Sequence, residues 1–214
     1  MREKAVSSGL RWAAKRALIV GLALWGFRFA VLDLYMIPSD SMEPSLIAGD
    51  VVVVSKFTYG TRLPFTNTHL LAALPKRGDV AVFKLPSDVS QFYIKRVIGM
   101  PGDSVRIAQG RVYLNGKRLP RRQVQDFALN RTTAPPIKVP QYLETEPDGP
   151  TSYRIIETYG DNGARDTTDT YYVPPGHVFV LGDNRDNSVD SRVFEQPYQF
   201  VPLSLLVGKK IAAF

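Results

Sequence analysis

The most constraining feature of this chain is a single long apolar run near its start. Residues 17–37 read ALIVGLALWGFRFAVLDLYMI, with charges only at Arg28 and Asp33 toward the far end. As a helix, a run of this length spans roughly 30 Å, the thickness of a bilayer core. Both charged side chains then lie near the membrane surface, where snorkelling lowers their cost. Because no small-x-small pair ends the run, as it would before a signal-peptide cleavage site, we predict a retained transmembrane anchor at 17–37.

The charge distribution predicts the orientation of this anchor. Residues 1–37 contain six Lys and Arg against two Asp and Glu, which accounts for +4 of the net charge of +7. Lys15 and Arg16 border the apolar run, and positive flanks stay on the cytoplasmic side. We therefore expect residues 1–16 to form a cytoplasmic basic tail and residues 38–214 an extracytoplasmic domain. The sequence has no basic stripe interleaved with aromatic residues, so nucleic acid is not an expected partner.

After the apolar run the pattern changes to short strands separated by turns. The chain has 16 glycines, 16 prolines, 10 tyrosines and 11 phenylalanines, which favours strands over long helices. Val51–Val54 is typical of a buried strand, and apolar residues alternate over 79–85 and 92–98. Asn115-Gly116, between two strand-like segments, is the signal of a type I′ hairpin turn. The predicted fold class is all-β, preceded by one N-terminal transmembrane helix.

The middle of the domain is predicted to hold an inserted β-ribbon subdomain, at about 120–175. Residues 120–150 are polar and rich in proline, which indicates loops or additional short strands. Residues 151–158 and 170–173 have the character of two arms of a long ribbon around Gly160–Gly163. The apolar residues 177–181 follow as the next strand of the main domain.

Two residues suggest a catalytic site. Ser41 follows the anchor directly, in the segment IPSDSMEPSL (37–46), and Lys95 stands in the alternating strand pattern of 92–98. The chain has no cysteine, and its only two histidines, His69 and His177, are not near this serine in sequence. A serine hydrolase that uses lysine as its base is the economical interpretation. Either residue alone would be unremarkable, as a turn serine or a solvent-facing lysine.

Four sequence blocks strengthen this interpretation when they are taken together and in order. They are IPSDSMEPSL with Gly49-Asp50, RGDVAVF (77–83), YIKRV (93–97) with GMPGD (99–103), and GDNRDNSVDSR (182–192). In these blocks the chain resembles the bacterial type I signal peptidases, or leader peptidases, over nearly all of residues 35–209. The resemblance implies a signal-peptidase-like β fold and a membrane-anchored serine endopeptidase that removes signal peptides. It implies no cofactor and no metal.

The resemblance also implies roles for individual residues. Ser41 matches the family nucleophile, Lys95 the general base, and Ser188 the hydroxyl that orients the lysine. Ser39 is placed to join the Ser41 backbone N–H in an oxyanion hole. A lysine with its usual pKa near 10.4 is almost fully charged at neutral pH, so the base requires a pKa lowered by burial. Four further charged residues are expected to brace the site as ion pairs: Arg96, Asp183, Asp190 and Arg192.

The expected substrates are signal-peptide-bearing preproteins at a bacterial plasma (inner) membrane, so the lipid bilayer is the second expected partner. An extended peptide points successive side chains to opposite faces, so a site can admit small residues at two alternate positions. We expect cleavage after Ala-x-Ala, with Ile37, Met42 and Ile94 lining the shallow pockets. The sequence does not indicate the oligomeric state or the preferred preproteins.

Other functions are compatible with parts of this sequence pattern. A specialised peptidase that matures conjugative pilus subunits, and a catalytically silent, membrane-tethered binding module, remain alternatives. Self-cleaving repressors share a Ser-Lys dyad, but they carry an N-terminal helix-turn-helix and no anchor. Residues 193–202 form a longer link than the family usually has, which leaves the position of the final strand open.

Overall fold

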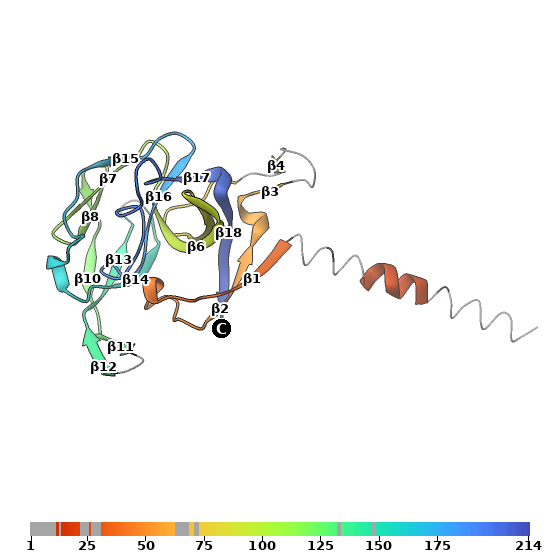
Figure 1. Ribbon diagram of the computed structural model, residues 1–214, viewed down its shortest axis with the longest axis horizontal. Helices are drawn as coiled ribbons and strands as arrows, with labels where there is room; N and C mark the ends of the chain where they lie inside the picture. Colours follow the sequence, from red (N-terminus) through yellow and green to blue (C-terminus); the bar gives the residue numbers. More distant parts are fainter. Residues whose placement is uncertain are drawn as a thin grey trace, which may run out of the picture.

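The computed structural model describes residues 12, 14–21, 26, 31–62, 69–70, 73–131, 134–146 and 149–214. From residue 32 onward the described chain consists of strands, loops and four short 3-10 turns (Figure 1). The turns are η1 (Asp40–Met42), η2 (Lys56–Tyr59), η3 (Gly160–Asn162) and η4 (Leu203–Leu205). The mostly β character predicted from the sequence is therefore confirmed.

A seven-stranded sheet forms the larger part of the domain, in the order β1-β2-β18-β5-β6-β16-β17. Its strands, in that order, are Leu32–Met36, Val51–Ser55, Leu206–Ala213, Val80–Leu85, Asp88–Gly99, His177–Leu181 and Val201–Pro202. One row crosses the sheet from Leu32 through Ser55, Lys209 and Ala81 to Lys95. Lys95 therefore lies in the same cross-strand row as Leu32, the first residue of β1.

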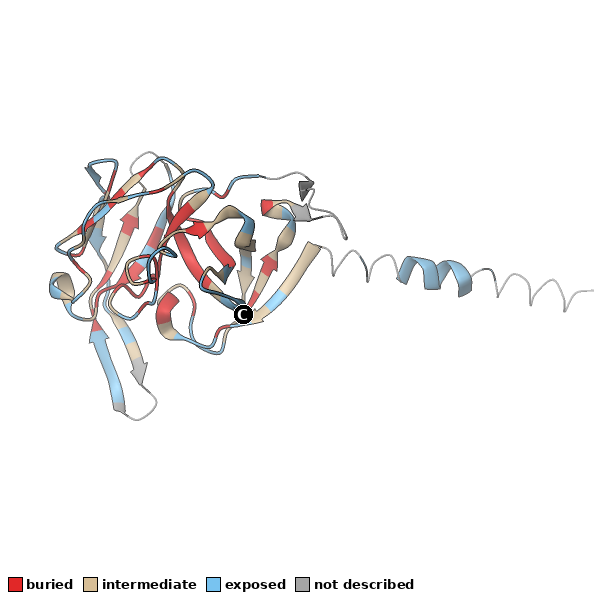
Figure 2. Cartoon of the chain, turned by 45° about the horizontal axis from the view of Figure 1, so that its top comes forward, coloured by how far each residue is buried: buried red, intermediate tan, exposed pale blue. Residues whose placement is uncertain are grey.

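Two apolar clusters fill the space around this sheet, because its strands alternate in side-chain direction. On β5, Val80 and Val82 belong to one cluster, whereas Ala81 and Phe83 belong to the other. Figure 2 shows buried residues concentrated along these central strands. The first cluster also contains Ile37, Met42, Leu46, Val52, Val54 and Ile94.

Two smaller sheets and a hairpin make up the rest of the domain. The four-stranded sheet contains β15 (Tyr171–Tyr172), β7 (Ser104–Ala108), β8 (Arg111–Leu114) and β9 (Lys117–Arg118). The three-stranded sheet contains β10 (Arg121–Gln123), β13 (Gln141–Thr145) and β14 (Ser152–Ile156). The hairpin of β11 (Phe127–Arg131) and β12 (Ala134–Val139) extends from the body (Figures 1 and 2). A short pair, β3 (Thr61–Arg62) and β4 (His69–Leu70), completes the strands.

Local turn chemistry explains the β8–β9 connection. Asn115 and Gly116 both have positive φ angles, 51° and 77°. A type I′ turn requires this conformation at its two central residues, and asparagine and glycine tolerate it best. The predicted hairpin is confirmed.

The inserted segment differs from its prediction. The two expected ribbon arms do not pair with each other, because β14 pairs with β13 and β15 pairs with β7. Tyr153 and Ile155 on β14 are buried in a third cluster with Ile98, Ile107 and Phe179. Burying these side chains against the main sheet outweighs the short-range pairing that the sequence pattern favoured.

The structure also differs from the prediction at the outer end of the anchor. Leu32–Met36 form β1 and pair with β2, although we placed these residues in the membrane helix. Pairing satisfies their backbone groups in the sheet, and Tyr35 packs on the cluster that contains Ile37. Helical residues are described at 14–21, 26 and 31, and residues 22–25 and 27–30 of the predicted anchor lie outside the described part. Within the described part of the chain, no helix is long and apolar enough to cross a membrane.

The final strand lies inside the sheet. β18 pairs with β2 on one side and β5 on the other. The long link before it folds back on the domain, since Phe194 is buried with its ring edge toward Tyr93, at a centroid distance of 6.1 Å, and Val201 enters β17. The additional residues are therefore accommodated in a loop.

Candidate active site

The predicted nucleophile lies on a turn held from both sides. Ser41 is the middle residue of η1, and its neighbour Met42 is fully buried in the apolar cluster beneath. From the other side, the Asn184 backbone N–H donates to Ser41 O at 3.2 Å, and its side-chain amide donates to Asp40 O at 3.1 Å. The turn is thus fixed by a buried apolar residue and by hydrogen bonds to its backbone. Ser41 itself is only 7% exposed.

Lys95 meets this serine across 54 residues of sequence. It lies on β6, is 3% exposed, and its Nζ donates to Ser41 Oγ at 2.7 Å and to Ile94 O at 2.9 Å. The ring of Tyr93 lies 5.4 Å from the amine. Burial lowers the pKa of Lys95 to about 8, although the charges of Asp190 and Asp183 act in the opposite direction. A substantial share of the amine is therefore uncharged in mildly alkaline solution.

Ser39 is brought to the same place. Its Oγ lies 3.3 Å from Ser41 Oγ, and its backbone is extended, with φ of −140° and ψ of 156°, just before η1. A second hydroxyl therefore lies beside that of Ser41. A hydroxyl at this position can donate to a negative oxygen that develops beside Ser41.

Ser188 also reaches the site, but without the predicted contact. Its side chain is buried, and its Oγ makes no hydrogen bond of acceptable geometry with a described residue. Gly182 allows this approach, because a Cβ there would lie 2.2 Å from Ser188 Oγ and 2.5 Å from Ser41 O. The Ser188 hydroxyl lies close enough to Asp190 to help lower the pKa of that carboxyl, and its Oγ has no well-formed hydrogen bond.

A cavity of about 440 Å³ opens over these residues. Ser39, Ser41, Ile94, Lys95 and Ser188 all contribute to its wall. The structure differs from the sequence prediction for Ile37 and Met42, which are not part of the wall. At 2% and 0% exposed they are core residues, because they anchor the nucleophile turn from below. The remaining wall residues are Pro38, Asp40, Gln91, Phe92, Tyr93, Arg165, Asp186, Asn187 and Val189.

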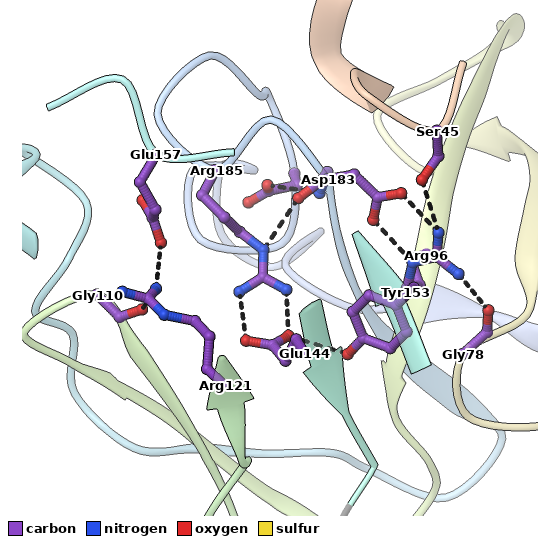
Figure 3. A network of polar contacts seen from close by, with 12 residues as sticks. Ser45, Gly78, Arg96, Gly110, Arg121, Glu144, Tyr153, Glu157, Asp183 and Arg185 are labelled. Carbon is purple, nitrogen blue, oxygen red and sulfur yellow. Dashed lines mark hydrogen bonds and ion pairs between the residues drawn. The ribbon is translucent and has the colours of Figure 1, made fainter. Parts of the chain in front are cut away.

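Buried ion pairs surround the site, as expected for the charged residues near it. Arg96 Nη2 lies 2.5 Å from Asp183 Oδ2, and Arg192 Nη2 lies 2.8 Å from Asp190 Oδ2. Arg96 also donates to Gly78 O at 2.6 Å (Figure 3). These arginines pair with the two carboxylates whose charges act on Lys95. The lysine itself makes no ion pair with any described carboxylate.

Sequence reasoning missed the second half of this network. Arg185 forms a buried ion pair with Glu144, whose other contact is the hydroxyl of Tyr153 at 3.0 Å (Figure 3). Glu144 and Tyr153 belong to the inserted sheet, so only the fold brings them to Arg185. Asn184 was also missed as a residue that fixes the turn, although it lies within the GDNRDNSVDSR block.

One group of described carboxylates could hold a metal ion. Oxygens of Glu157, Asp166 and Asp186 lie within 4.8 Å of one another. Arg121 pairs with Glu157 at 2.9 Å and already supplies a positive charge there. Burial raises the pKa of Glu157 to about 8.

Comparison with known proteins assigns the chain to a family. The model of the family described as "Signal peptidase, peptidase S26" matches residues 10–214. Signal peptidase I of Rickettsia conorii is 34% identical over 206 residues, which cover 90% of this chain and 74% of the relative. Signal peptidase I of Rickettsia rickettsii gives the same identity and coverage.

A solved structure was found as well. The crystal structure of a signal peptidase I from Enterococcus faecalis is 25% identical, covers 64% of this chain and 97% of its own, and has a TM-score of 0.36. The assignment rests on the family model and on the Rickettsia relatives, which span most of the sequence. The chain belongs to the signal peptidase family, peptidase S26.

Proposed function

We propose that this chain is a membrane-anchored serine endopeptidase that removes signal peptides from exported preproteins, with Ser41 as nucleophile and Lys95 as general base. The observation that carries the proposal is the 2.7 Å hydrogen bond between Lys95 Nζ and Ser41 Oγ in a buried setting. A catalytically silent binding module would have no need for a lysine buried without a carboxylate partner, since burying a charge is costly.

The proposed reaction begins when neutral Lys95 takes the proton of the Ser41 hydroxyl. Ser41 Oγ then attacks the carbonyl carbon of the scissile bond, and the resulting oxyanion is stabilised by the Ser41 N–H and the Ser39 hydroxyl. The Lys95 ammonium returns the proton to the leaving amine. In the second half, Lys95 deprotonates a water molecule that hydrolyses the acyl-enzyme.

Ser188 has a specific part in this scheme. A neutral lysine amine has two N–H donors and one lone pair. If the lone pair faces the Ser41 hydroxyl and one N–H donates to Ile94 O, as their distances allow, one N–H is left over. Ser188 Oγ is buried, adjoins Asp190 and has no well-formed hydrogen bond, and it is the acceptor we propose for this N–H.

The proposed substrate is an extended segment with small residues at alternate positions, cleaved after Ala-x-Ala. Ile94 supports this, because it is 8% exposed and lies in the cavity wall next to Lys95. We propose that the N-terminus is cytoplasmic, that the anchor lies in a bacterial plasma membrane, and that the catalytic domain faces outward. The basic flank at Lys15 and Arg16 supports this orientation.

The proposal is tested by cleavage of a preprotein with an Ala-x-Ala site, using the full-length chain in detergent. Ser41→Ala and Lys95→Ala should each lower kcat/KM by at least about 1,000-fold, because nucleophile and base act as one unit. The matched controls are Ser90→Ala and Lys84→Ala, two exposed residues of the neighbouring strands β6 and β5, which should cleave normally. Near-normal turnover by folded Lys95→Ala would contradict the assignment.

A further inference from the structure

A cation that the proposed chemistry does not use lies in the cavity wall. Arg165 belongs to the inserted segment, in the loop that follows η3, and is half-buried. It lines the same cavity as Ser41, Lys95 and Ser188. Its Nη1 donates to the backbone oxygen of Ser188. The insertion therefore contributes a permanent positive charge next to the proposed scissile bond.

Most of the hydrogen-bonding capacity of this guanidinium is unused. An arginine side chain has five N–H donors in a planar fork, suited to binding a carboxylate with two hydrogen bonds. In the described part of the chain, Arg165 makes one hydrogen bond and no ion pair. The buried arginines nearby differ, since Arg96, Arg185 and Arg192 each pair with a carboxylate of the protein. Arg165 lacks the anion that its neighbours have.

We propose that Arg165 is a specificity-determining residue, which selects preproteins carrying an acidic side chain at one position close to the scissile bond. This inference rests on the proposed cleavage at Ser41 and adds a charge preference to it. A substrate carboxylate would accept hydrogen bonds from the free edge of the guanidinium, while Nη1 remains bound to Ser188.

The preference is confined to one position, because the cavity also contains carboxylates. Asp40 adjoins Ser41, and Asp186 accepts the Tyr159 N–H at 2.8 Å while lining the same wall. Both repel an acidic substrate side chain that lies near them. Asp186 also lies against the loop of Arg165, 2.0 Å from where a Cβ on Gly163 would be, so an acid is favoured only where it contacts the guanidinium directly. Lys95 adds no charge to this selection, since its working form is neutral.

The test is a charge scan with the full-length enzyme in detergent. Peptides share an Ala-x-Ala site and carry a single Asp, Asn or Lys at each position around it, outside the two alanines. At one position the Asp peptide should be cleaved about three- to tenfold faster in kcat/KM than the Asn peptide, the range for a half-buried charge pair. Arg165→Gln should bring this ratio to about one, and Arg165→Glu should favour Lys at that position.

A control variant and the salt dependence show whether the Asp preference comes from the charge of Arg165. Arg154→Gln, at an exposed arginine on β14 of the same insertion, should keep the ratio of the wild type. The ratio should fall as ionic strength rises, because salt screens a pair that is open to solvent.

Three outcomes would overturn the inference. One is an equal rate for Asp and Asn peptides at every position. Another is an equal loss on all peptides in Arg165→Gln, which would mean that the residue serves only to hold Ser188. If peptides are cleaved but a preference survives in Arg165→Gln, another residue carries it. Failure to cleave any peptide would instead remove the proposed function, and this inference with it.

Discussion

Lys95 and the arginines that link the main sheet to the insertion are all buried cations, but their surroundings are opposite. Lys95 contacts a hydroxyl and a carbonyl, and burial lowers its pKa to about 8. Burial also acts to lower the pKa of Arg185, but the charge and hydrogen bond of Glu144, together with the charges of Tyr153 and Glu157, raise it by more. Both cations are thus desolvated, Arg185 beside a carboxylate partner and Lys95 without one.

The same difference is found between two adjacent residues of strand β6. Lys95 and Arg96 are neighbours on β6, so their side chains point to opposite faces. Lys95 turns toward Ser41, whereas Arg96 turns toward Asp183 and stacks over the ring of Tyr153 at 4.2 Å. The unpaired cation has the lowered pKa, and the paired one links β6 to Asp183 and to Tyr153 of β14.

The largest expected effect on stability comes from removing a paired arginine. Arg185→Met should lower the free energy of unfolding by about 3–5 kcal/mol, because Glu144 is left as a buried carboxylate without its partner. Chemical denaturation followed by circular dichroism measures the change. Arg154→Met, at an exposed position, is the control and should have little effect. A loss no larger than that of the control would mean that the pair does not hold the insertion.

Replacing Lys95 by methionine should raise the free energy of unfolding, in contrast to the replacement of Arg185. The lowered pKa of Lys95 means that the folded state resists its charge below about pH 8, so Lys95→Met should stabilise the protein by up to about 3 kcal/mol at pH 7. The gain should shrink as pH rises from about 8 toward the unfolded-state value, where the lysine is neutral in both states. Destabilisation by Lys95→Met at pH 7 would contradict the comparison.

Gly182 tests the contact between the turn of Ser41 and the segment 182–192. A Cβ at this residue would clash with Ser41 O at 2.5 Å, and a backbone atom cannot move aside cheaply. Gly182→Ala should therefore lower kcat/KM by about 100-fold, with the circular dichroism spectrum retained. Gly21→Ala, where no atom lies within 4 Å of the added methyl group, is the control. Unchanged kinetics in Gly182→Ala would mean that the turn tolerates displacement.

The sequence predicts the local features of this molecule well. The presence of β5 and β6, the Asn115-Gly116 turn and the bounds of β16 follow from apolar patterning and turn chemistry, which act over a few residues. The expected alternation of buried and exposed residues does not hold, because residues 80–83 and 94–99 are buried in succession. The candidate dyad was found because both residues lie in recognisable blocks. Its distance of 2.7 Å and its burial come only from the fold.

The features that were missed depend on long-range packing. Tyr153 and Ile155 draw β14 away from the expected ribbon, because the main sheet offers them a core. The ion pair of Arg185 with Glu144 joins residues 41 positions apart, and no short motif indicates it. Ile37 and Met42 were predicted to line the pockets but are core residues beneath the turn of Ser41, and periodicity alone does not tell a cavity wall from the core behind it.

The central claim is that an unpaired, buried lysine acts as the base, and the pH dependence of kcat/KM tests it most directly. Proton uptake from Ser41 requires neutral Lys95, so kcat/KM for an Ala-x-Ala substrate should rise with pH through an apparent pKa of about 8 and then level off. Rates should be measured on the full-length enzyme between pH 6 and pH 11, with folding checked at each pH. A rise that begins only near pH 10, where an exposed lysine titrates, would contradict the account.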